Sequence, residues 1–262
     1  MYTMSNGNIE LGIYDKKKGL VNSVPLESCD PKLMGRGNYR GLGRPPSLRG
    51  VTEWTSPDLT PSKLAQRREV AEMLSGGTVL ELYGGKGHLS TNVWAKSDAD
   101  KLIVLDKDSG FIKAAKKSLK GKIPHETVVS ENTKWLKHMD PKQLKNLKVV
   151  DFDAFGSPTK QVKMFFDNYP IKKRMLICLT DGSNIFLAFH KNRKSAHTFL
   201  KKRYGIDFEP TGKREDQIKA LDSLMQQQAQ KHDFKVEPIN VAFGKRQSVY
   251  AAYKISPKRN KN

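Results

Sequence analysis

The sequence predicts an α/β fold: a mostly parallel, seven-stranded sheet that ends in a β-hairpin and follows an irregular basic N-terminal arm. Short apolar runs alternate with helix-length segments between residues 78 and 179, as in parallel sheets covered by helices on both faces. Two more strand-like runs close the sequence, whereas residues 1–59 are rich in Gly, Pro, Ser and Asn. We therefore expect an arm over 1–59, a folded domain over 60–256 and a basic tail over 257–262.

The expected domain begins with a helix. Thr60 suits the N-cap position and Pro61 the first helical position, where a missing N–H is tolerated. The glycine pair Gly76-Gly77 ends the helix. Its expected apolar face consists of Leu64, Ala65, Val70, Met73 and Leu74.

The remaining elements follow from runs of aliphatic residues and from apolar residues at helical spacing. The expected strands cover 78–82, 102–105, 125–129, 147–152, 175–179, 235–243 and 247–255. The expected helices cover 88–95, 109–119, a short stretch around Trp135, 160–168 and 214–231. Gly244-Lys245-Arg246 joins the last two strands as a hairpin turn. A terminal hairpin is not typical of the ordinary dinucleotide-binding domain.

Composition narrows the class of protein. The chain has 262 residues, 47 Lys+Arg against 27 Asp+Glu, and a formal net charge of +20, which favours a polyanionic partner. No apolar run is long enough for a membrane span, and Met1 to Leu20 lacks the apolar core of a secretory signal. Cys29 and Cys178 form neither a disulfide framework nor a cysteine metal site. We expect a cytoplasmic protein without metal or membrane attachment.

Basic residues in two segments are the candidates for nucleic-acid binding. Arginines alternate with glycines and one tyrosine in the arm, a composition that lies well along a phosphate backbone. A disordered leader is an equally good interpretation of that segment. The candidate nucleic-acid-binding residues are Arg36, Arg40, Arg44, Arg49, Lys191, Arg193 and Lys194.

A glycine-rich loop is the strongest local motif. The strand over 78–82 runs directly into Tyr83-Gly84-Gly85-Lys86-Gly87 and then into a helix. Glycines let the backbone approach a ligand closely and turn onto a helix N-terminus. The spacing differs from that of a P-loop, and Glu81 would repel a pyrophosphate but attract an ammonium group. The expected cofactor is therefore S-adenosylmethionine rather than NAD, held in part by Glu81, Tyr83, Gly84, Gly85 and Gly87.

Acids after the next two strands extend this expected cofactor site. Asp106 ends the strand over 102–105, where a carboxylate can bind both hydroxyls of a ribose, and Lys107 follows it. Glu131 and Asn132 come after the third strand and suit an adenine amino group. A helix-capping cluster is the other interpretation of this pair.

The segment Asp151-Phe152-Asp153-Ala154-Phe155-Gly156-Ser157-Pro158 resembles the D-x-D-P-F-G-S-P signature of the tRNA guanine-N2 dimethyltransferase family, with Ala154 in place of proline. Glu131-Asn132 and Thr180-Asp181 also resemble segments of that family, and the similarity covers roughly residues 78 to 187. The glycine loop is closer to the F-x-G-x-G loops of amino-methylating DNA methyltransferases. The resemblance implies a Rossmann-like class I methyltransferase fold dependent on S-adenosylmethionine.

This resemblance and the chemistry of the residues together predict the catalytic set. Asp153 and a backbone carbonyl near Ala154 would accept hydrogen bonds from an exocyclic amine and raise its nucleophilicity. Phe155 would stack on the extruded base, and Gly156 lets the backbone pass close to it. Asp153 also belongs to the expected cofactor-binding residues, and a structural acid at a strand end is its other interpretation.

The predicted function is methylation of an exocyclic amine in a nucleic-acid base, with DNA or tRNA as the partner. The altered proline and the lack of room for a tRNA-type C-terminal domain place adenine N6 of DNA ahead of guanine N2 of tRNA. The alternative is a catalytically silent nucleic-acid-binding protein that keeps the methyltransferase fold.

Overall fold

The computed structural model describes residues 61–144, 146–154, 156–183, 193–211, 214–244 and 248–258, apart from the side chains of 193–195 and 214. It also describes the backbone of three short segments within residues 2–25. The chain divides into two compact units, Met1–Pro57 and Asp58–Asn262. No helix among the described residues is long and apolar enough to cross a lipid bilayer.

The first unit holds a small antiparallel sheet in the order β1-β2-β3. Its strands are β1 (Tyr2–Ser5), β2 (Asn8–Asp15) and β3 (Gly19–Pro25). The expectation of an irregular arm is wrong for these segments. Backbone pairing between neighbouring strands of a hairpin needs no strongly apolar pattern, so composition alone does not reveal it.

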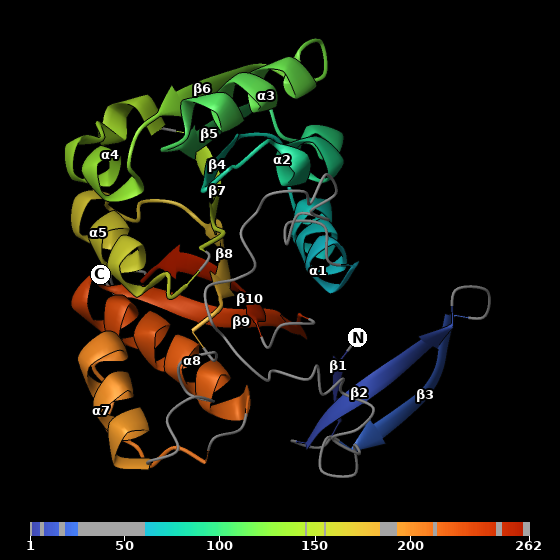
Figure 1. Cartoon of the computed structure of the whole chain (residues 1–262), viewed down its shortest axis with the longest axis vertical. Coiled ribbons are helices and arrows are strands. Elements are labelled where there is room, and N and C mark those ends of the chain that lie inside the picture. The colour runs from blue at the N-terminus through green and yellow to red at the C-terminus, as the bar shows by residue number, and fades with distance from the viewer. Residues whose placement is uncertain are drawn as a thin grey trace, which may run out of the picture. The chain divides into compact units, whose positions relative to one another are not determined.

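The second unit contains a seven-stranded sheet in the order β6-β5-β4-β7-β8-β10-β9 (Figure 1). Neighbouring strands from β6 to β8 run parallel, and β10 is antiparallel to both β8 and β9. This confirms the predicted parallel sheet and its terminal hairpin. The strands are β4 (Thr78–Leu82), β5 (Lys101–Asp106), β6 (His125–Val129), β7 (Leu147–Phe152), β8 (Met175–Asp181), β9 (Phe234–Phe243) and β10 (Val249–Pro257).

Helices cover both faces of this sheet. The elements on one face are α1 (Pro61–Glu72), α2 (His88–Asn92), the short 3-10 helix η3 (Trp94–Lys96) and α3 (Ser109–Leu119). Those on the other are α4 (Asn132–His138), the 3-10 helix η4 (Pro141–Leu144), α5 (Thr159–Asn168), α7 (Arg193–Tyr204) and α8 (Arg214–Lys231). Helix α7 was not predicted, although its buried residues Ala196, Leu200 and Tyr204 recur at helical spacing.

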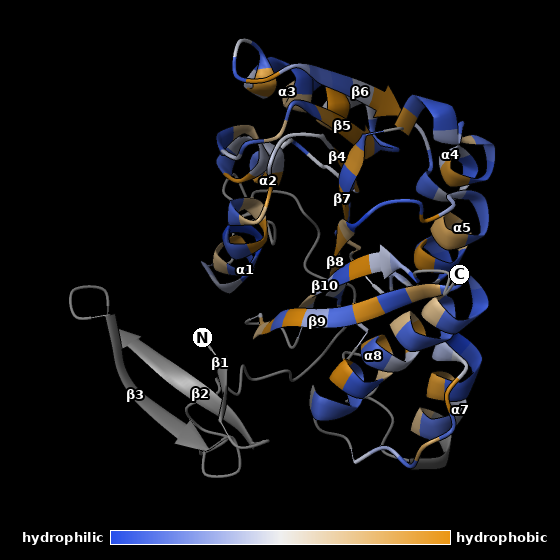
Figure 2. Ribbon diagram, turned by 180° about the vertical axis from the view of Figure 1, so that it is seen from behind, coloured by the Kyte–Doolittle hydropathy of each residue, from blue (hydrophilic) through white to orange (hydrophobic). Residues whose placement is uncertain are grey.

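Side chains of the central strands alternate between two apolar layers. In β5, Leu102 and Val104 pack toward α2 and α3, whereas Ile103 and Leu105 pack toward the α4, α5 and α8 side. Figure 2 shows this as apolar colour along β4, β5, β7 and β8, with more polar colour on the helices. The central strands are buried on both faces, as the continuous apolar runs predict.

Helix α1 differs from the others in what it buries. Its buried residues are Lys63, Gln66, Arg67, Val70 and Ala71, whereas Ala65 and Met73, expected on the apolar face, are exposed. Val70 and Leu74 are buried as predicted, but the prediction is wrong for Ala65 and Met73 and misses the buried polar residues, because hydropathy treats every cation as solvent-facing. Here the cations are buried because carboxylates on the sheet pair with them.

Candidate active site

Five parallel strands end along one edge of the sheet, and the candidate residues follow those ends. Leu82 lies level with Leu105 on one side and Phe152 on the other, and Phe152 lies level with Leu179. The loops after β4, β5, β7 and β8 therefore leave the sheet next to one another.

Close packing explains the glycines of the loop after β4. Gly84 donates its N–H to the Leu105 carbonyl at 2.7 Å, and a Cβ at this position would come within 2.2 Å of Val104 Cγ1. Gly87 starts α2 with a φ of 76°, and its Cβ would lie 2.9 Å from the Cα of Ala115. The loop backbone therefore lies against β5 and α3 at a distance that only glycine allows.

Glu81 lies in β4 just before this loop and is 2% exposed. Ser90 Oγ of α2 donates a hydrogen bond to its carboxylate. Ser90 is itself fully buried, so this pair ties the start of α2 to the strand that precedes the loop.

The carboxylate of Asp106 is bound to the backbone on both sides. The N–H of Gly85 donates to Oδ2 at 3.0 Å, and that of Asp108 donates to Oδ1 at 2.9 Å. Each carboxylate oxygen can accept two hydrogen bonds, so both retain acceptor capacity. Asp106 is half-buried, and the neighbouring Lys107 is exposed.

Asn132 presents a buried acceptor next to the glycine loop. Its side chain is 6% exposed, and Oδ1 has no hydrogen-bond partner among the described residues. Burial raises the pKa of Tyr83 to about 12, against the effect of a hydrogen bond from the Asn132 side chain. Tyr83 has a φ of 68°, so the loop backbone turns sharply at the residue that Asn132 contacts.

Two exposed apolar residues belong to elements next to Asp106. Val129 pairs in register with Asp106 and is 54% exposed at the end of β6. Phe111, in the first turn of α3, is 40% exposed, and the Lys86 ammonium lies 5.8 Å from its ring centroid. Large exposed apolar groups of this kind provide a surface for a flat ring.

A buried charge cluster lies at the end of β7. Arg67 of α1 donates to both oxygens of Asp151, at 2.7 and 2.9 Å, and to Thr180 Oγ1 at 3.1 Å. One helical turn earlier, Lys63 Nζ lies 2.5 Å from Asp153 Oδ2. Four residues of helix rise about 6 Å and two residues of strand about 6.6 Å, so the two cations match the two carboxylates. The sequence analysis missed Lys63 and Arg67, because this spacing match has a meaning only once α1 is known to pack on β7.

A second buried polar cluster lies at the end of β8. Asp181 is fully buried and accepts hydrogen bonds from the Tyr204 hydroxyl and, at 2.7 Å, from the Ser183 N–H. Gln217 Nε2 of α8 donates to the Asp181 carbonyl at 2.7 Å. Burial raises the pKa of the Asp181 carboxyl. These contacts fix α7 and α8 to the same edge of the sheet.

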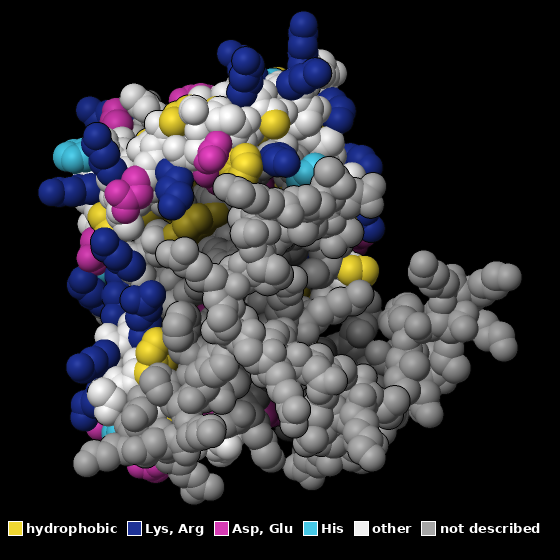
Figure 3. Space-filling view, viewed as in Figure 1, with side chains coloured by type: hydrophobic (Ala, Val, Ile, Leu, Met, Phe, Trp, Pro, Cys, Tyr) yellow, Lys and Arg dark blue, Asp and Glu magenta, His cyan; other side chains and the backbone are white. Residues whose placement is uncertain are grey.

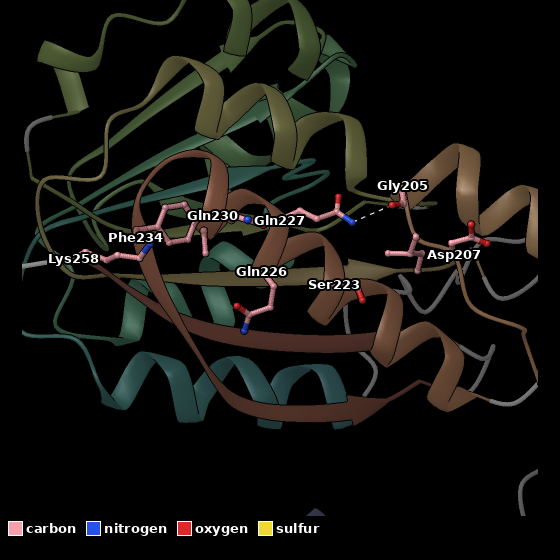
Figure 4. A pocket seen from close by; sticks show the side chains of 10 residues that line it. Gly205, Asp207, Ser223, Gln226, Gln227, Gln230, Phe234 and Lys258 are labelled. Atoms are coloured by element: carbon pink, nitrogen blue, oxygen red, sulfur yellow. Dashed lines mark hydrogen bonds between the residues drawn. The ribbon is translucent and has the colours of Figure 1, made fainter.

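A hollow of about 610 Å³ lies elsewhere, against α8 (Figure 4). Its lining is mostly polar: Gly205, Ile206, Asp207, Ser223, Gln226, Gln227, Ala229, Gln230, Phe234 and Lys258. Lys258 follows the end of β10 that pairs with Met175, the first residue of β8. The hollow therefore lies near the amino-terminal end of β8, whereas the candidate site residues lie at the carboxyl ends of the parallel strands.

No protein-family model matches the chain, and no curated protein matches it in sequence. Among solved structures it is similar to Trm1 from Pyrococcus horikoshii in complex with S-adenosyl-L-methionine, at 15% identity and a TM-score of 0.57, over 78% of this chain and 58% of that one. The chain thus spans little more than half of that protein's length. The sheet order and this likeness decide the fold. The chain has a Rossmann-like methyltransferase fold.

Two further structures are less similar. A dimethyladenosine transferase from Plasmodium falciparum has 17% identity and a TM-score of 0.46, with 76% of this chain and 62% of that one covered. TYW2 from M. jannaschii in complex with AdoMet has 11% identity and a TM-score of 0.46, with 98% and 85% covered.

The methyltransferase fold brings most of the predicted site residues to one edge. The loop glycines follow β4, Asp106 ends β5, Glu131 and Asn132 follow β6, and Asp153 follows β7. Glu131 is the exposed N-cap of α4 and accepts a hydrogen bond from Thr133 Oγ1 at 2.6 Å. Ala154 is buried, and the Gly156 carbonyl accepts from the Gly182 N–H at 3.1 Å.

Other predicted residues lie outside the described part of the chain. These are Phe155, Arg36, Arg40, Arg44, Arg49 and Lys191. Arg193 and Lys194 belong to the first turn of α7, but the structure does not describe their side chains. The nucleic-acid contacts expected of them stay predictions.

Proposed function

We propose that this chain transfers a methyl group from S-adenosylmethionine to an exocyclic amine of a nucleic-acid base. One arrangement carries the proposal: the glycine loop, Asp106 and Asn132 share an edge of the sheet with Asp153, which follows the neighbouring strand β7. The first three would hold the cofactor, and Asp153 would hold the acceptor amine.

The residues present fit S-adenosylmethionine. Asn132 Oδ1, buried and without a partner among the described residues, is the acceptor that an adenine amino group needs. The remaining lone pairs of Asp106 suit the ribose hydroxyls, and the backbone of the tight glycine loop would lie against the cofactor. Val129 and Phe111 supply apolar surface for the purine ring.

The bound cofactor would supply an electrophilic methyl group on a sulfonium. The chain's own task is to hold the acceptor nitrogen: Asp153 accepts one of its N–H groups, so the lone pair is less delocalised into the ring. As the nitrogen–methyl bond forms and the sulfur–methyl bond breaks, the amine releases a proton to solvent. No metal is needed for this chemistry.

Charge supports a nucleic-acid substrate. The described surface seen in Figure 3 carries many Lys and Arg side chains and few acidic ones. On α3 alone, Lys113, Lys116 and Lys117 are exposed, and exposed Lys120 follows them. Such a surface attracts phosphate backbones. Adenine N6 and guanine N2 are the candidate acceptors, as exocyclic amines that Asp153 can receive.

Methyl incorporation from labelled S-adenosylmethionine tests the proposal. Purified chain is incubated with duplex DNA and with tRNA, and the labelled product is hydrolysed to nucleosides to identify the base. Asp153→Asn should lower incorporation by about 10²-fold or more, while Asp167→Asn, which changes an exposed carboxylate on α5, should leave it unchanged. No incorporation into either polymer would refute the activity.

The buried pairing of Asp153 with Lys63, together with Tyr83 and Ala154 at positions where the related motifs have other residues, favours a second function. In that alternative the chain binds nucleic acid without chemistry, and Asp153 is a structural acid. Polynucleotide binding that is unaffected by Asp153→Asn, combined with no methyl incorporation by the unmodified chain, would identify it.

A further inference from the structure

The pairing of Lys63 with Asp153 is unusual because both charges are removed from water. Their side chains are 3% and 4% exposed, and 2.5 Å separates Lys63 Nζ from Asp153 Oδ2. The ammonium also lies 5.8 Å from the ring centroid of Tyr250 in β10. Burying a lysine is unfavourable unless a specific partner offsets the lost hydration.

Packing of α1 does not by itself require this lysine. Arg67 already holds Asp151 with two hydrogen bonds, and Gln66 Nε2 donates to Asn240 Oδ1 of β9 at 2.7 Å. Asn240 in turn donates to Glu69 Oε2 of α1 at 2.6 Å. Helix α1 is therefore fixed to β7 and β9 by side chains other than Lys63, whose partner is the candidate acceptor residue.

The charged and titratable groups around Asp153 come from every element packed against it. Lys63 and Arg67 approach from α1, Asp151 lies on β7, Thr180 and Cys178 on β8, and Tyr250 on β10. Two cations thus balance two carboxylates. Burial alone would raise the pKa of the Asp153 carboxyl, but Lys63 and then Arg67 outweigh it and lower that pKa below its usual value.

We propose that Lys63 is a positioning residue of the methyl-acceptor site: it keeps Asp153 ionised and fixes the direction in which its carboxylate accepts the amine N–H. This inference rests on the proposed function and deepens it. A carboxylate held in this way is a good hydrogen-bond acceptor and a poor base, so the proton released on methylation passes to water rather than to Asp153.

The test removes the ammonium and asks what happens to the Asp153 carboxyl. Lys63→Met keeps an unbranched apolar side chain, Lys63→Arg restores the positive charge, and Gln66→Met is the matched control because it weakens the packing of the same helix face without changing charge. Asp153 is titrated by NMR with ¹³Cγ-labelled aspartate, assigned with Asp153→Asn. The kcat of methyl transfer is then measured between pH 3 and pH 9, so that the acidic limb set by Asp153 falls within the range.

The expected result follows from the sign of the burial effect. Without the ammonium, desolvation raises the Asp153 pKa, so Lys63→Met should move its titration and the acidic limb of the kcat profile upward by about one pH unit or more. The KM for S-adenosylmethionine should stay within about twofold, because the partner of Lys63 is Asp153 and not one of the residues proposed to hold the cofactor. Lys63→Arg and Gln66→Met should keep both curves at wild-type pH values.

Several outcomes would overturn the inference. The inference is wrong if the Asp153 titration in Lys63→Met equals that of the unmodified chain, or if Gln66→Met moves the pH profile as far as Lys63→Met does. If Lys63→Met does not fold, a shifted pH profile in Lys63→Arg contradicts the role of charge and an unshifted one supports it. An unmodified chain that methylates nothing refutes the proposed function instead, and the NMR titration still decides whether Lys63 keeps Asp153 ionised.

Discussion

At the scale of single residues, most buried charges of the candidate site are paired with a group on a neighbouring element. Arg67 and Asp151 are both fully buried and form two hydrogen bonds. Such a pair adds little net stability compared with apolar packing, but removing one partner leaves an isolated charge away from water. Its main consequence is to hold α1 in one position against β7.

Arg67→Met should therefore lower the free energy of unfolding by about 3–5 kcal/mol, measured by urea denaturation at pH 7. Lys231→Met, which removes an exposed ion pair with Asp167, should change it by less than about 1 kcal/mol. Adding Asp151→Asn to Arg67→Met should recover part of the loss, because the unpaired charge is then gone. A loss below about 1 kcal/mol in Arg67→Met would contradict this account.

Asn132 gives a second prediction at this scale, for cofactor recognition. Asn132→Leu should weaken binding of S-adenosylhomocysteine about tenfold, equal to about 1.4 kcal/mol, as measured by calorimetry. Tyr83→Phe removes the other partner of the Tyr83–Asn132 hydrogen bond and should change the affinity less than threefold.

A ligand analogue makes the Asn132 prediction sharper. The unmodified chain should discriminate against an analogue whose adenine amino group is replaced by oxygen, because Asn132 Oδ1 can only accept a hydrogen bond. Asn132→Leu should lose that discrimination. Equal discrimination in both proteins would show that a group other than Asn132 recognises the adenine amino group.

At the scale of elements, the glycine loop depends on how closely β4, β5 and α3 pack. Gly84 fits only because it lacks a side chain opposite Val104, and Gly87 begins α2 against the backbone of α3. Val104 is itself fully buried, so it has little room to move. The loop conformation is therefore set by the strand beneath it.

Gly84→Ala should lower the free energy of unfolding by about 1–3 kcal/mol through overpacking and weaken S-adenosylhomocysteine binding. Val104→Ala in the same chain should restore much of the binding, since it removes the methyl group that the new Cβ meets. Gly156→Ala is the control for stability, because its Cβ would meet no atom of the described residues within 4 Å. Failure of Val104→Ala to restore binding would argue against the packing explanation.

At the scale of the whole molecule, the two units have different expected roles. The second unit, Asp58–Asn262, contains the entire seven-stranded sheet and both apolar layers. Four candidate arginines lie in the first unit, in a segment outside the described residues. We therefore treat folding and cofactor binding as properties of the second unit, and part of the polyanion affinity as a property of the first.

A chain of residues 58–262 should unfold cooperatively and bind S-adenosylhomocysteine as the full chain does. Replacing Arg36, Arg40, Arg44 and Arg49 by Gln in the full chain should reduce the slope of log affinity for duplex DNA against log salt by about 3–4, since each phosphate contact contributes about 0.9. The thermal midpoint of this variant should equal that of the unmodified chain. An unchanged slope would show that these four arginines make no phosphate contacts.

Local patterns in the sequence were sufficient to predict the seven-stranded sheet. Continuous apolar runs predict strands buried on both faces, and β4 to β8 and the β9–β10 hairpin follow that prediction. The glycines, Asp106 and Asn132 could be predicted as candidate site residues because loops after neighbouring parallel strands meet at one edge. Strands β1 to β3 were missed because their polar, glycine-containing segments carry weak periodicity, and helix α7 because its few apolar residues stand among many basic ones.

Sequence patterns alone predict the succession of strands in the seven-stranded sheet and which loops carry polar groups, because backbone periodicity and glycine are local properties. Only the tertiary structure decided which charges are buried together. Lys63 and Asp153 are 90 residues apart, and a lysine on a helix is ordinarily solvated. Its burial becomes favourable only when packing of α1 on β7 brings a carboxylate to it, and no local pattern contains that information.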